Sequence, residues 1–306
     1  MQPPNSKADT FAAHRGHLFG VAYRMLGSRS DAEDVLHDAW LRWETSDTTA
    51  VRSNEAWLTT TVTRLSIDRL RKAQVERENN YFGPWLPEPL SDAVMRSPEV
   101  ALERDEDVSL AFLTLLETLS PEERAVFVLH DILDDDYADI AETVDKTAAA
   151  CRQMVHRARE RVTARRRRFV VDDATRIRML EKFIAAANRG DRDELMTLFA
   201  DDAIMTSDGG GKATAAIRPL HGARRIAWLW FAVARHLTDG LVRRIVHVNG
   251  EPALATFARG RLHSVSTIET DGRRIYAYFS IANPDKLGAF RELVTDSPAR
   301  ASTDHE

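Results

Sequence analysis

Two helical patterns joined by a three-residue turn place the strongest constraint on how this chain folds. The first would pack through Ile140, Ala141 and Val144. The second carries an apolar stripe with the period of an amphipathic helix, made of Cys151, Val155, Ala158 and Val162. Residues 145–147 between them leave room only for a tight turn. The spacing therefore predicts a helix-turn-helix.

The outer face of the second helix is basic. Residues 146–169 contain nine Lys or Arg residues and one acid, Glu160. Arg and Gln supply the hydrogen-bond donors that read a DNA major groove, whereas the alternative is a solvated basic face. The arginine run 165–168 favours DNA. The candidate base- and phosphate-contacting residues are Arg152, Gln153, His156 and Arg157.

The net charge of -5 hides this polarity, because residues 108–145 hold ten acids against Arg124 alone. With 43% apolar and 29% charged residues, the composition is that of a soluble globular protein.

The start, MQPPNSKADT, lacks a signal-peptide core, and we expect a cytoplasmic protein without membrane spans. One cysteine and scattered histidines predict no disulfide, no metal site and no cofactor. Cys151 lies on the apolar stripe, which favours a packing role over a redox role.

Residues 9–75 are predicted to be helical. One helix buries Ala32, Val35, Leu36, Ala39, Trp40 and Trp43 behind a capping box of Ser30 and Glu33. Its acidic face, Asp31, Asp34 and Asp38, is either a solvated surface or a docking ridge for a basic partner. The next helix begins near Asn54. It buries Leu58, Val62 and Leu65 and exposes Arg64, Asp68, Arg71 and Lys72.

Residues 76–107 are rich in proline and acids and are predicted to be a linker. Its motif WLPEPL carries Trp85, Leu86 and Leu90, an apolar strip that needs a surface to cover it. Helical patterning returns over 108–169, where Ser120 and Glu123 form a second capping box. Residues 170–295 then combine helices with strands separated by Asn-Gly and Asp-Gly turns, and 296–306 are predicted to be a flexible tail.

The stretch TSDGGGKAT at 206–214 is not a phosphate-binding P-loop. Thr206 and Ala213 stand where that loop requires glycine and a hydroxyl residue. Three glycines permit positive φ and the close approach of another backbone. Asp208 and Lys212 add opposite charges at the two ends. The stretch is therefore predicted to clasp a neighbouring segment, with WLPEPL as its partner.

Long segments of the chain resemble an extracytoplasmic-function (ECF) RNA polymerase sigma factor. RMLGSRSDAEDVLHDAWLRW and NEAWLTTTVTRLSIDRLRKA are similar to region 2, and the segment from Leu119 to Val162 is similar to region 4. WLPEPL, DGGGK at 208–212 and NPDKL at 283–287 are signatures of the SigJ-like group, which carries a fused SnoaL-like domain. Asp145 departs from the glycine that is common in the turn, and Ala282 from a larger, often basic residue before NPDKL.

The resemblance implies two all-α sigma domains, 9–75 and 108–169, followed by an α+β cone with a curved antiparallel sheet. It implies that Asp31, Asp34, Asp38 and Trp40 bind core RNA polymerase. The -10 promoter element would contact Arg64, Asp68, Arg69, Arg71 and Lys72, and the -35 element Arg152, Gln153, His156 and Arg157. Regulatory interdomain contacts would come from Trp85, Leu86 and Pro87, from Asp208, Gly209, Gly210, Gly211 and Lys212, and from Asn283, Pro284, Asp285 and Lys286.

These assignments predict a transcription initiation factor, not an enzyme, whose C-terminal domain replaces a separate anti-sigma factor. A small molecule held in the cone is a further expectation. Two alternatives stay open: a ligand-sensing one-component DNA-binding regulator, and a SnoaL-like enzyme that uses acid/base chemistry. Asp202, Asp208, His221, His247 and His263 are available for such chemistry, but their spacing defines no dyad.

Overall fold

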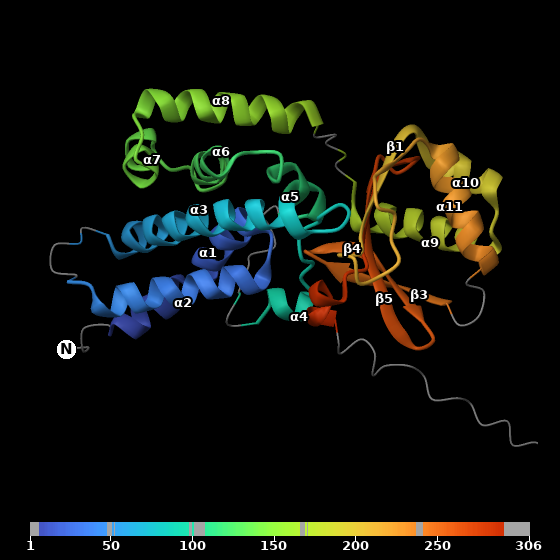
Figure 1. The fold of residues 1–306 in the computed structure, drawn as a ribbon, viewed down its shortest axis with the longest axis horizontal. Coiled ribbons are helices and arrows are strands. Elements are labelled where there is room, and N and C mark those ends of the chain that lie inside the picture. Colours follow the sequence, from blue (N-terminus) through green and yellow to red (C-terminus); the bar gives the residue numbers. More distant parts are fainter. Residues whose placement is uncertain are drawn as a thin grey trace, which may run out of the picture. The chain divides into compact units, whose positions relative to one another are not determined.

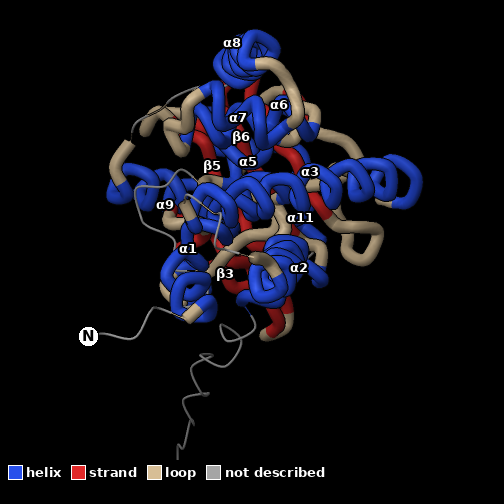
Figure 2. Tube along the Cα trace, turned by 90° about the vertical axis from the view of Figure 1, so that its left-hand side faces the viewer, coloured by secondary structure: helices blue, strands red, loops and turns tan. Residues whose placement is uncertain are grey.

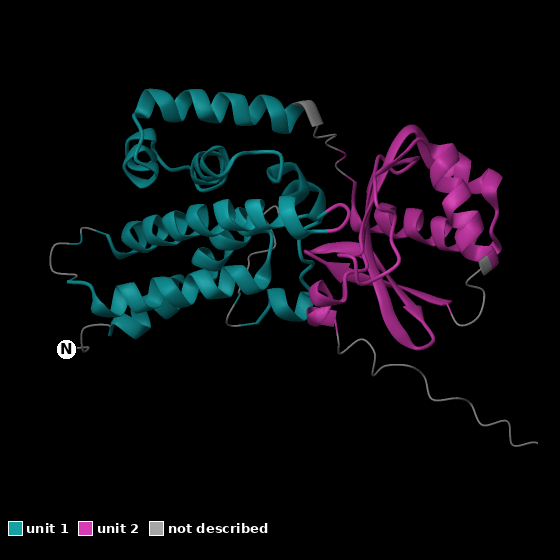
Figure 3. Cartoon of the chain, in the orientation of Figure 1, with its two compact units in different colours: residues 1–81, 85–168 teal, residues 82–84, 169–306 magenta. Residues whose placement is uncertain are grey.

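The chain folds into two compact units, each described here by itself (Figure 3). Unit 1 contains residues 1–81 and 85–168, and unit 2 contains residues 82–84 and 169–306. Helices, blue in Figure 2, build unit 1, whereas unit 2 adds the strands drawn in red. The computed structural model describes residues 6–47, 51, 53–97, 100, 108–165, 169, 171–236 and 241–290. The predicted tail 296–306 and the arginines at 166–168 lie outside these residues.

Unit 1 consists of helices, which are labelled in chain order in Figure 1. Its first part comprises α1 (Lys7–Leu26), α2 (Arg29–Thr45), α3 (Asn54–Asn80) and the short α4 (Asp92–Met95). Its second part comprises α5 (Leu110–Leu116), α6 (Pro121–Phe127), the π-helical turn η1 (Val128–Ile132), α7 (Tyr137–Val144) and α8 (Ala148–Arg165).

Helix α2 begins earlier than the sequence pattern predicted. Its N-cap is Ser28, whose side chain accepts a hydrogen bond from the Asp31 backbone N–H. The capping box of Ser30 and Glu33 is therefore wrong. Gly27 ends α1 in the left-handed conformation, so Ser28 is the first residue free to cap the next helix. The second predicted box, Ser120 with Glu123 at the start of α6, is confirmed.

Helix α3 extends through Asn80, five residues into the segment 76–107 that the sequence assigned to the linker. The residues ERENN tolerate helix well, and the chain leaves the helix only just before Gly83 and Pro84. Basic residues near the end of α3 are thereby placed beside the other helices of unit 1, which a flexible linker would not do.

The helix-turn-helix is confirmed in α7 and α8. Asp145 ends α7 with φ of 54°, a left-handed conformation that Asp tolerates better than most residues. The turn therefore forms without glycine. Thr147 Oγ1 accepts a hydrogen bond from the Ala150 N–H at the start of α8. Cys151 is fully buried on the predicted stripe, and burial raises the pKa of its thiol.

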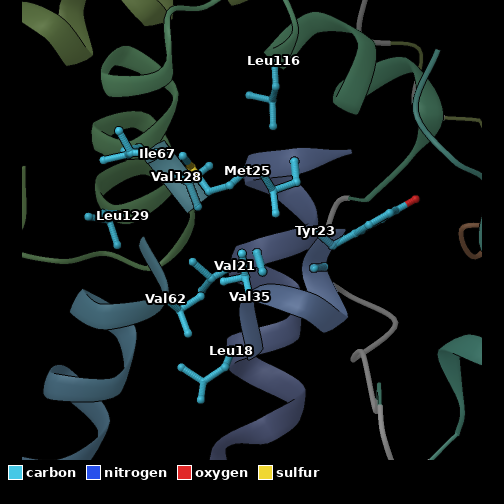
Figure 4. Close-up of a cluster of buried hydrophobic side chains, with 14 of the residues drawn as sticks. Leu18, Val21, Tyr23, Met25, Val35, Val62, Ile67, Leu116, Val128 and Leu129 are labelled. Atoms are coloured by element: carbon cyan, nitrogen blue, oxygen red, sulfur yellow. The ribbon is translucent and has the colours of Figure 1, made fainter. Parts of the chain in front are cut away.

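One hydrophobic core joins the two parts of unit 1. Side chains from α1 and α3 meet those from α5 and η1 in a single cluster (Figure 4). The labelled members include Leu18, Val21, Val62, Leu116, Val128 and Leu129, all at most 1% exposed. The two predicted helical domains therefore pack as one body, because they share buried apolar surface.

Unit 2 is an α+β fold around a six-stranded sheet of order β2-β1-β6-β5-β4-β3. Its helices are α9 (Asp173–Arg189), α10 (Arg192–Leu198) and α11 (Ala223–His236), with a 3-10 turn η2 (Pro284–Lys286). Its strands are β1 (Phe199–Asp208), β2 (Leu220–His221), β3 (Leu241–Val248), β4 (Glu251–Ala258), β5 (Arg261–Thr270) and β6 (Ile275–Ile281). The pair β1–β6 is parallel and the others are antiparallel. The strands β3 to β6 follow the predicted pattern, whereas β1 was not predicted.

The core of unit 2 lies between α9, α10 and α11 and one face of the sheet. Phe183 of α9 packs edge-on against Phe199 and Trp230 and lies 5.2 Å from the Tyr278 ring, between centroids. Leu254 and Ile268 contribute from the neighbouring strands. This face of the sheet, covered by helices, therefore supplies the interior of the unit.

Candidate polymerase-binding and promoter-binding surfaces

The acidic ridge of α2 already carries a basic partner. Arg69 of α3 donates two hydrogen bonds to Asp31 Oδ1, at 2.6 and 2.8 Å, and a third to Asp34 at 3.1 Å. The hydrogen bond to Asp31 raises the pKa of Arg69. Asp38 adds a weaker electrostatic contribution from the next turn. Trp40 lies at the edge of the ridge, half-buried, with its ring 5.3 Å from that of Phe11.

The basic face of α3 contacts the second part of unit 1. Arg64 donates to the backbone carbonyls of Thr143 and Glu142 at 3.0 and 2.7 Å. Arg71 pairs with Glu122 of α6, which raises the pKa of Arg71, and with Asp68 at 3.2 Å. Two of the predicted -10 contacts are thus held by α6 and α7. The remaining predicted residue, Lys72, is exposed.

The predicted reading face of α8 is exposed. Arg152, Gln153, His156 and Arg157 all lie on the surface. Arg152 stacks toward Tyr137, 5.4 Å from the ring centroid, and Arg157 lies 3.8 Å from Glu123. The residues one turn further on are more firmly held. Arg159 makes a bidentate pair with Asp131, both bonds 2.8 Å long, and Arg161 pairs with Glu123.

A buried charge cluster, missed by sequence reasoning, connects the parts of unit 1. Glu117 accepts from Arg77 at 2.9 Å and from Arg124 at 2.7 Å, and Arg124 also donates to the Met25 carbonyl. The Arg124 side chain is only 1% exposed. Burial is the main cause that lowers the pKa of Arg77, and nearby Arg124 adds to it. The sequence signal that could have indicated this cluster was Arg124 itself, the one basic Lys or Arg residue among the ten acids of residues 108–145.

The WLPEPL motif packs onto this cluster and onto the turn between α1 and α2. The Arg77 guanidinium lies 3.4 Å from the Trp85 ring centroid. Glu88 is anchored through its backbone, which donates to Gly27 and accepts from Tyr23, and its carboxylate accepts from the Arg29 N–H. The buried members are Leu86, Pro87, Pro89 and Leu90. Trp85 and Leu90 thus find a covering surface within unit 1, on Arg77 and in the hydrophobic core.

In unit 2, the motifs DGGGK and NPDKL hold each other. Lys286 pairs with Asp208 at 2.7 Å, and Lys212 pairs with Asp285. The Asp208 side chain is fully buried. Gly210 has φ of 56°, and a Cβ there would meet Asn283 at 2.3 Å. The predicted clasp thus has NPDKL among its partners, and its predicted contact with WLPEPL stays a prediction.

The linker also contributes to unit 2. Residues 82–84 belong to this unit, while Trp85 belongs to unit 1. Gly211 has φ of 71°, and a Cβ there would lie 3.3 Å from the Cβ of Phe82. Gly83 similarly approaches the backbone of Ile217. The glycine loop therefore contacts Phe82, and the loop that carries Ile217 approaches Gly83, in the segment that connects the two parts of unit 1.

Among the described residues, no group of three or more His, Cys, Asp or Glu side chains is placed to hold a metal ion. A search of the same residues finds no helix with the length and apolarity that crossing a membrane requires.

Comparison with known proteins decides the family. Family models for Sigma-70 region 2 and Sigma-70 region 4 match residues 10–76 and 109–162. The chain is 36% identical to the ECF RNA polymerase sigma factor SigJ of Mycobacterium tuberculosis, over 90% of this chain and 92% of the relative. This chain belongs to the ECF sigma factors. A probable ECF sigma factor, SigI, of the same organism is 29% identical over 91% and 94% of the two chains.

The similarity includes the C-terminal unit of this sigma factor. The crystal structure of the M. tuberculosis extracytoplasmic function sigma factor SigJ matches with a TM-score of 0.76 and 34% identity, covering 92% of this chain and 98% of the other. The fold class predicted from the sequence, two helical sigma regions followed by an α+β domain, is confirmed. Helices α1–α3 belong to region 2, and α5–α8 form region 4.

Proposed function

We propose that this sigma factor binds core RNA polymerase through the acidic ridge of α2, reads the -10 element with α3 and the -35 element with α8, and is modulated by its fused C-terminal unit. The family membership supports the general role. The chemistry of RNA synthesis belongs to the polymerase, and work on promoter DNA would place the protein in the cytoplasm.

The observation that carries the mechanism is that region 4 covers the basic face of α3. Arg64 and Arg71, both predicted -10 contacts, bind α7 and α6 instead. The -10 and -35 elements lie about 25 base pairs apart, or roughly 85 Å along B-DNA. Helices that touch each other cannot occupy both elements at once. The described unit 1 is thus a closed state, and the two regions separate when the promoter is bound.

The acidic ridge couples polymerase binding to this opening. A basic surface of the polymerase that docks on Asp31 and Asp34 competes with Arg69, which holds both carboxylates in the closed state. Docking therefore releases Arg69 toward the DNA side of α3. Exposed ion pairs contribute about 0–1 kcal/mol each, so a large protein interface can replace them.

The C-terminal unit would act through the linker. It contains residues 82–84, and its glycine loop contacts Phe82 at the point where the chain leaves α3. A shift of this loop changes the course of the only covalent connection between regions 2 and 4. In this way the fused unit replaces a separate anti-sigma protein, and a small molecule held in it would be the signal.

A reversible disulfide tests the closed state. The hydroxyls of Thr60 in α3 and Thr143 in α7 lie 3.1 Å apart. The variant Thr60→Cys/Thr143→Cys, built on Cys151→Ala, should crosslink on oxidation. The oxidised protein should then lose run-off transcription with core polymerase, and reduction should restore it. Each single-cysteine variant is the matched control. Full activity of the oxidised double variant would contradict the proposal.

Binding to core polymerase separates a sigma factor from a one-component regulator. Size-exclusion chromatography of the protein with core polymerase should give one co-eluting complex. Charge reversal at Asp31 and Asp34 to lysine should abolish it, while reversal at Asp173, on α9, should not. A protein that binds promoter DNA but never co-elutes with core polymerase would be a regulator of another class.

Two matched glycines test modulation through the linker. Gly211→Ala places a Cβ 3.3 Å from Phe82, whereas Gly260→Ala, at a similar φ of 75°, meets nothing within 4 Å. Gly211→Ala should change run-off transcription about fivefold, equivalent to about 1 kcal/mol of coupling. Gly260→Ala should leave it unchanged. Equal effects of the two substitutions would show that strain in unit 2, not the linker contact, is responsible.

A further inference from the structure

Three hydrogen-bond donors in unit 2 are buried without a partner. They are the Nε of Arg243 on β3, the indole Nε1 of Trp230 on α11 and the hydroxyl of Tyr278 on β6, and none has a hydrogen-bond acceptor among the described residues. Tyr278 is fully buried and Trp230 is 9% exposed. A buried donor without an acceptor is costly, so such groups usually meet a water, an ion or a ligand.

These donors lie close together. The Arg243 guanidinium carbon is 5.6 Å from the Trp230 ring centroid, and the Trp230 and Tyr278 rings are 5.5 Å apart. Burial raises the pKa of Tyr278 to about 12, with Ser266 and the positive charge of Arg243 acting in the opposite direction. The Tyr278 hydroxyl lies beside Ser266 but makes no hydrogen bond of normal geometry to a described residue. Three separate elements thus bring one charge and two neutral donors to one place.

Strand register extends this place with a row of hydroxyls. Arg243 pairs in register with Thr256, and Thr256 with Ser264. One row further along, Ser266 lies between Leu254 and Ser280, and Ser280 pairs with Ser207. Residues paired in register share a face, and Leu254 and Tyr278 belong to the core beneath the helices. The buried hydroxyl residues of this face are Ser207, Thr256, Ser264, Ser266 and Ser280.

Among the described residues, no acidic side chain lies beside the charge of Arg243. The polar contact that these residues provide is a hydrogen bond from its guanidinium to the neutral Oδ1 of Asn188. Burial lowers the pKa of this guanidinium, although arginine stays protonated in proteins. Arg243 is half-buried with its Nε atom fully buried, and a partly desolvated cation without a counter-charge is less favourable than a paired one, so an incoming anion would reduce that cost.

We propose that Arg243, Trp230 and Tyr278 form a binding site for a small organic carboxylate. The Arg243 guanidinium would pair with the carboxylate, and the indole N–H and the tyrosine hydroxyl would donate to the same group. Phe183 and Leu254 belong to the neighbouring hydrophobic core, so an aromatic or alkyl body on the acid would meet apolar surroundings there. This proposal deepens the sensing role proposed for unit 2 and is tested by binding alone, so it can fail or succeed independently of the transcription assays.

Calorimetric titration of the full chain tests the site with acetate, benzoate, phenylacetate and 1-naphthoate, and with benzamide as the uncharged counterpart of benzoate. At least one aryl carboxylate should bind, and benzamide should bind at least about tenfold more weakly, since a charge-assisted bond is lost. Binding of none of the acids at concentrations up to about 10 mM, where even millimolar affinities register, or equal binding of benzoate and benzamide, would overturn the proposal.

Variants locate the site. Arg243→Gln should lower the affinity for the acid at least about tenfold. Arg243→Lys, which keeps the charge, should lower the affinity less. Arg244→Gln is the matched control, because residue 244 follows on the same strand and faces the other side of the sheet. The indole N–H resonance of Trp230, assigned with Trp230→Phe, should shift on titration. Equal losses in the residue 243 and 244 variants, or an unmoved Trp230 resonance, would place the anion elsewhere.

Discussion

The two units hold their charged groups in different ways. In unit 1, the contacts between region 4 and the basic face of α3 are partly solvated: the side chains of Arg71 and Glu122 are 54% and 26% exposed. In unit 2, the pair of Asp208 and Lys286 is 0% and 11% exposed. Solvated pairs contribute little and exchange partners readily, whereas breaking a buried pair is costly. The comparison indicates a sigma unit built to open and a C-terminal clasp built to stay closed.

Breaking the clasp is the strongest test of this contrast. Asp208→Asn leaves Lys286 buried without its carboxylate, and we expect the free energy of unfolding of unit 2 to fall by about 3–5 kcal/mol. Urea denaturation followed by far-UV circular dichroism measures this change. Lys212→Gln removes the exposed pair with Asp285 of the same clasp and should cost less than about 1 kcal/mol. Similar costs for the two variants would remove the distinction between buried and solvated pairs.

The buried cluster of unit 1 limits how far the contrast can be taken. Glu117→Gln leaves Arg124, 1% exposed, facing a neutral amide. We expect a loss of about 3 kcal/mol, slightly less than at Asp208, because the Glu117 side chain is 19% exposed. Chemical denaturation of the full chain measures it. A cost below about 1 kcal/mol would mean that this cluster also opens easily.

Tyr278 makes the stability of unit 2 depend on pH. Its pKa rises from 10 in the unfolded chain to about 12 in the folded one, because burial disfavours the phenolate. Below pH 10 the hydroxyl is protonated in both states and the stabilising effect is complete. Between pH 10 and about 12 only the unfolded chain ionises, so stability falls, by about 2–3 kcal/mol. Thermal unfolding of wild type and Tyr278→Phe across this window should show the extra decline only in the wild type.

The smallest effect is expected at the solvated contact itself. Glu122→Gln frees Arg71 from region 4 and should weaken the closed state by less than about 1 kcal/mol. Fluorescence energy transfer between dyes on regions 2 and 4 should report a small rise in the open population, and global stability should not change. A stability loss comparable with that of Glu117→Gln would show that this contact belongs to the buried framework of unit 1.

Much of the fold was readable from periodicity and capping chemistry. The stripe of Cys151, Val155 and Ala158 located α8, and the Asn-Gly and Asp-Gly turns marked the ends of β3 and β5 among the last four strands. Strand β1 was not predicted because its sequence, FADDAIMTSD, carries two adjacent acids and its partner β6 lies some seventy residues away. The start of α2 was misplaced for a local reason, since Ser28 and Ser30 are both good caps and only the conformation of Gly27 selects between them.

The sequence by itself determined the elements, the family resemblance and the chemical character of each face, because these depend on residue type and short-range spacing. Only the tertiary structure decided which charges meet. Arg64 and Arg71 bind region 4. Lys286, which lies late in the sequence of unit 2, pairs with Asp208. Arg243 lies beside Trp230 and Tyr278. Such pairings join residues far apart in the chain, and they follow from how buried apolar surfaces pack, which no local pattern encodes.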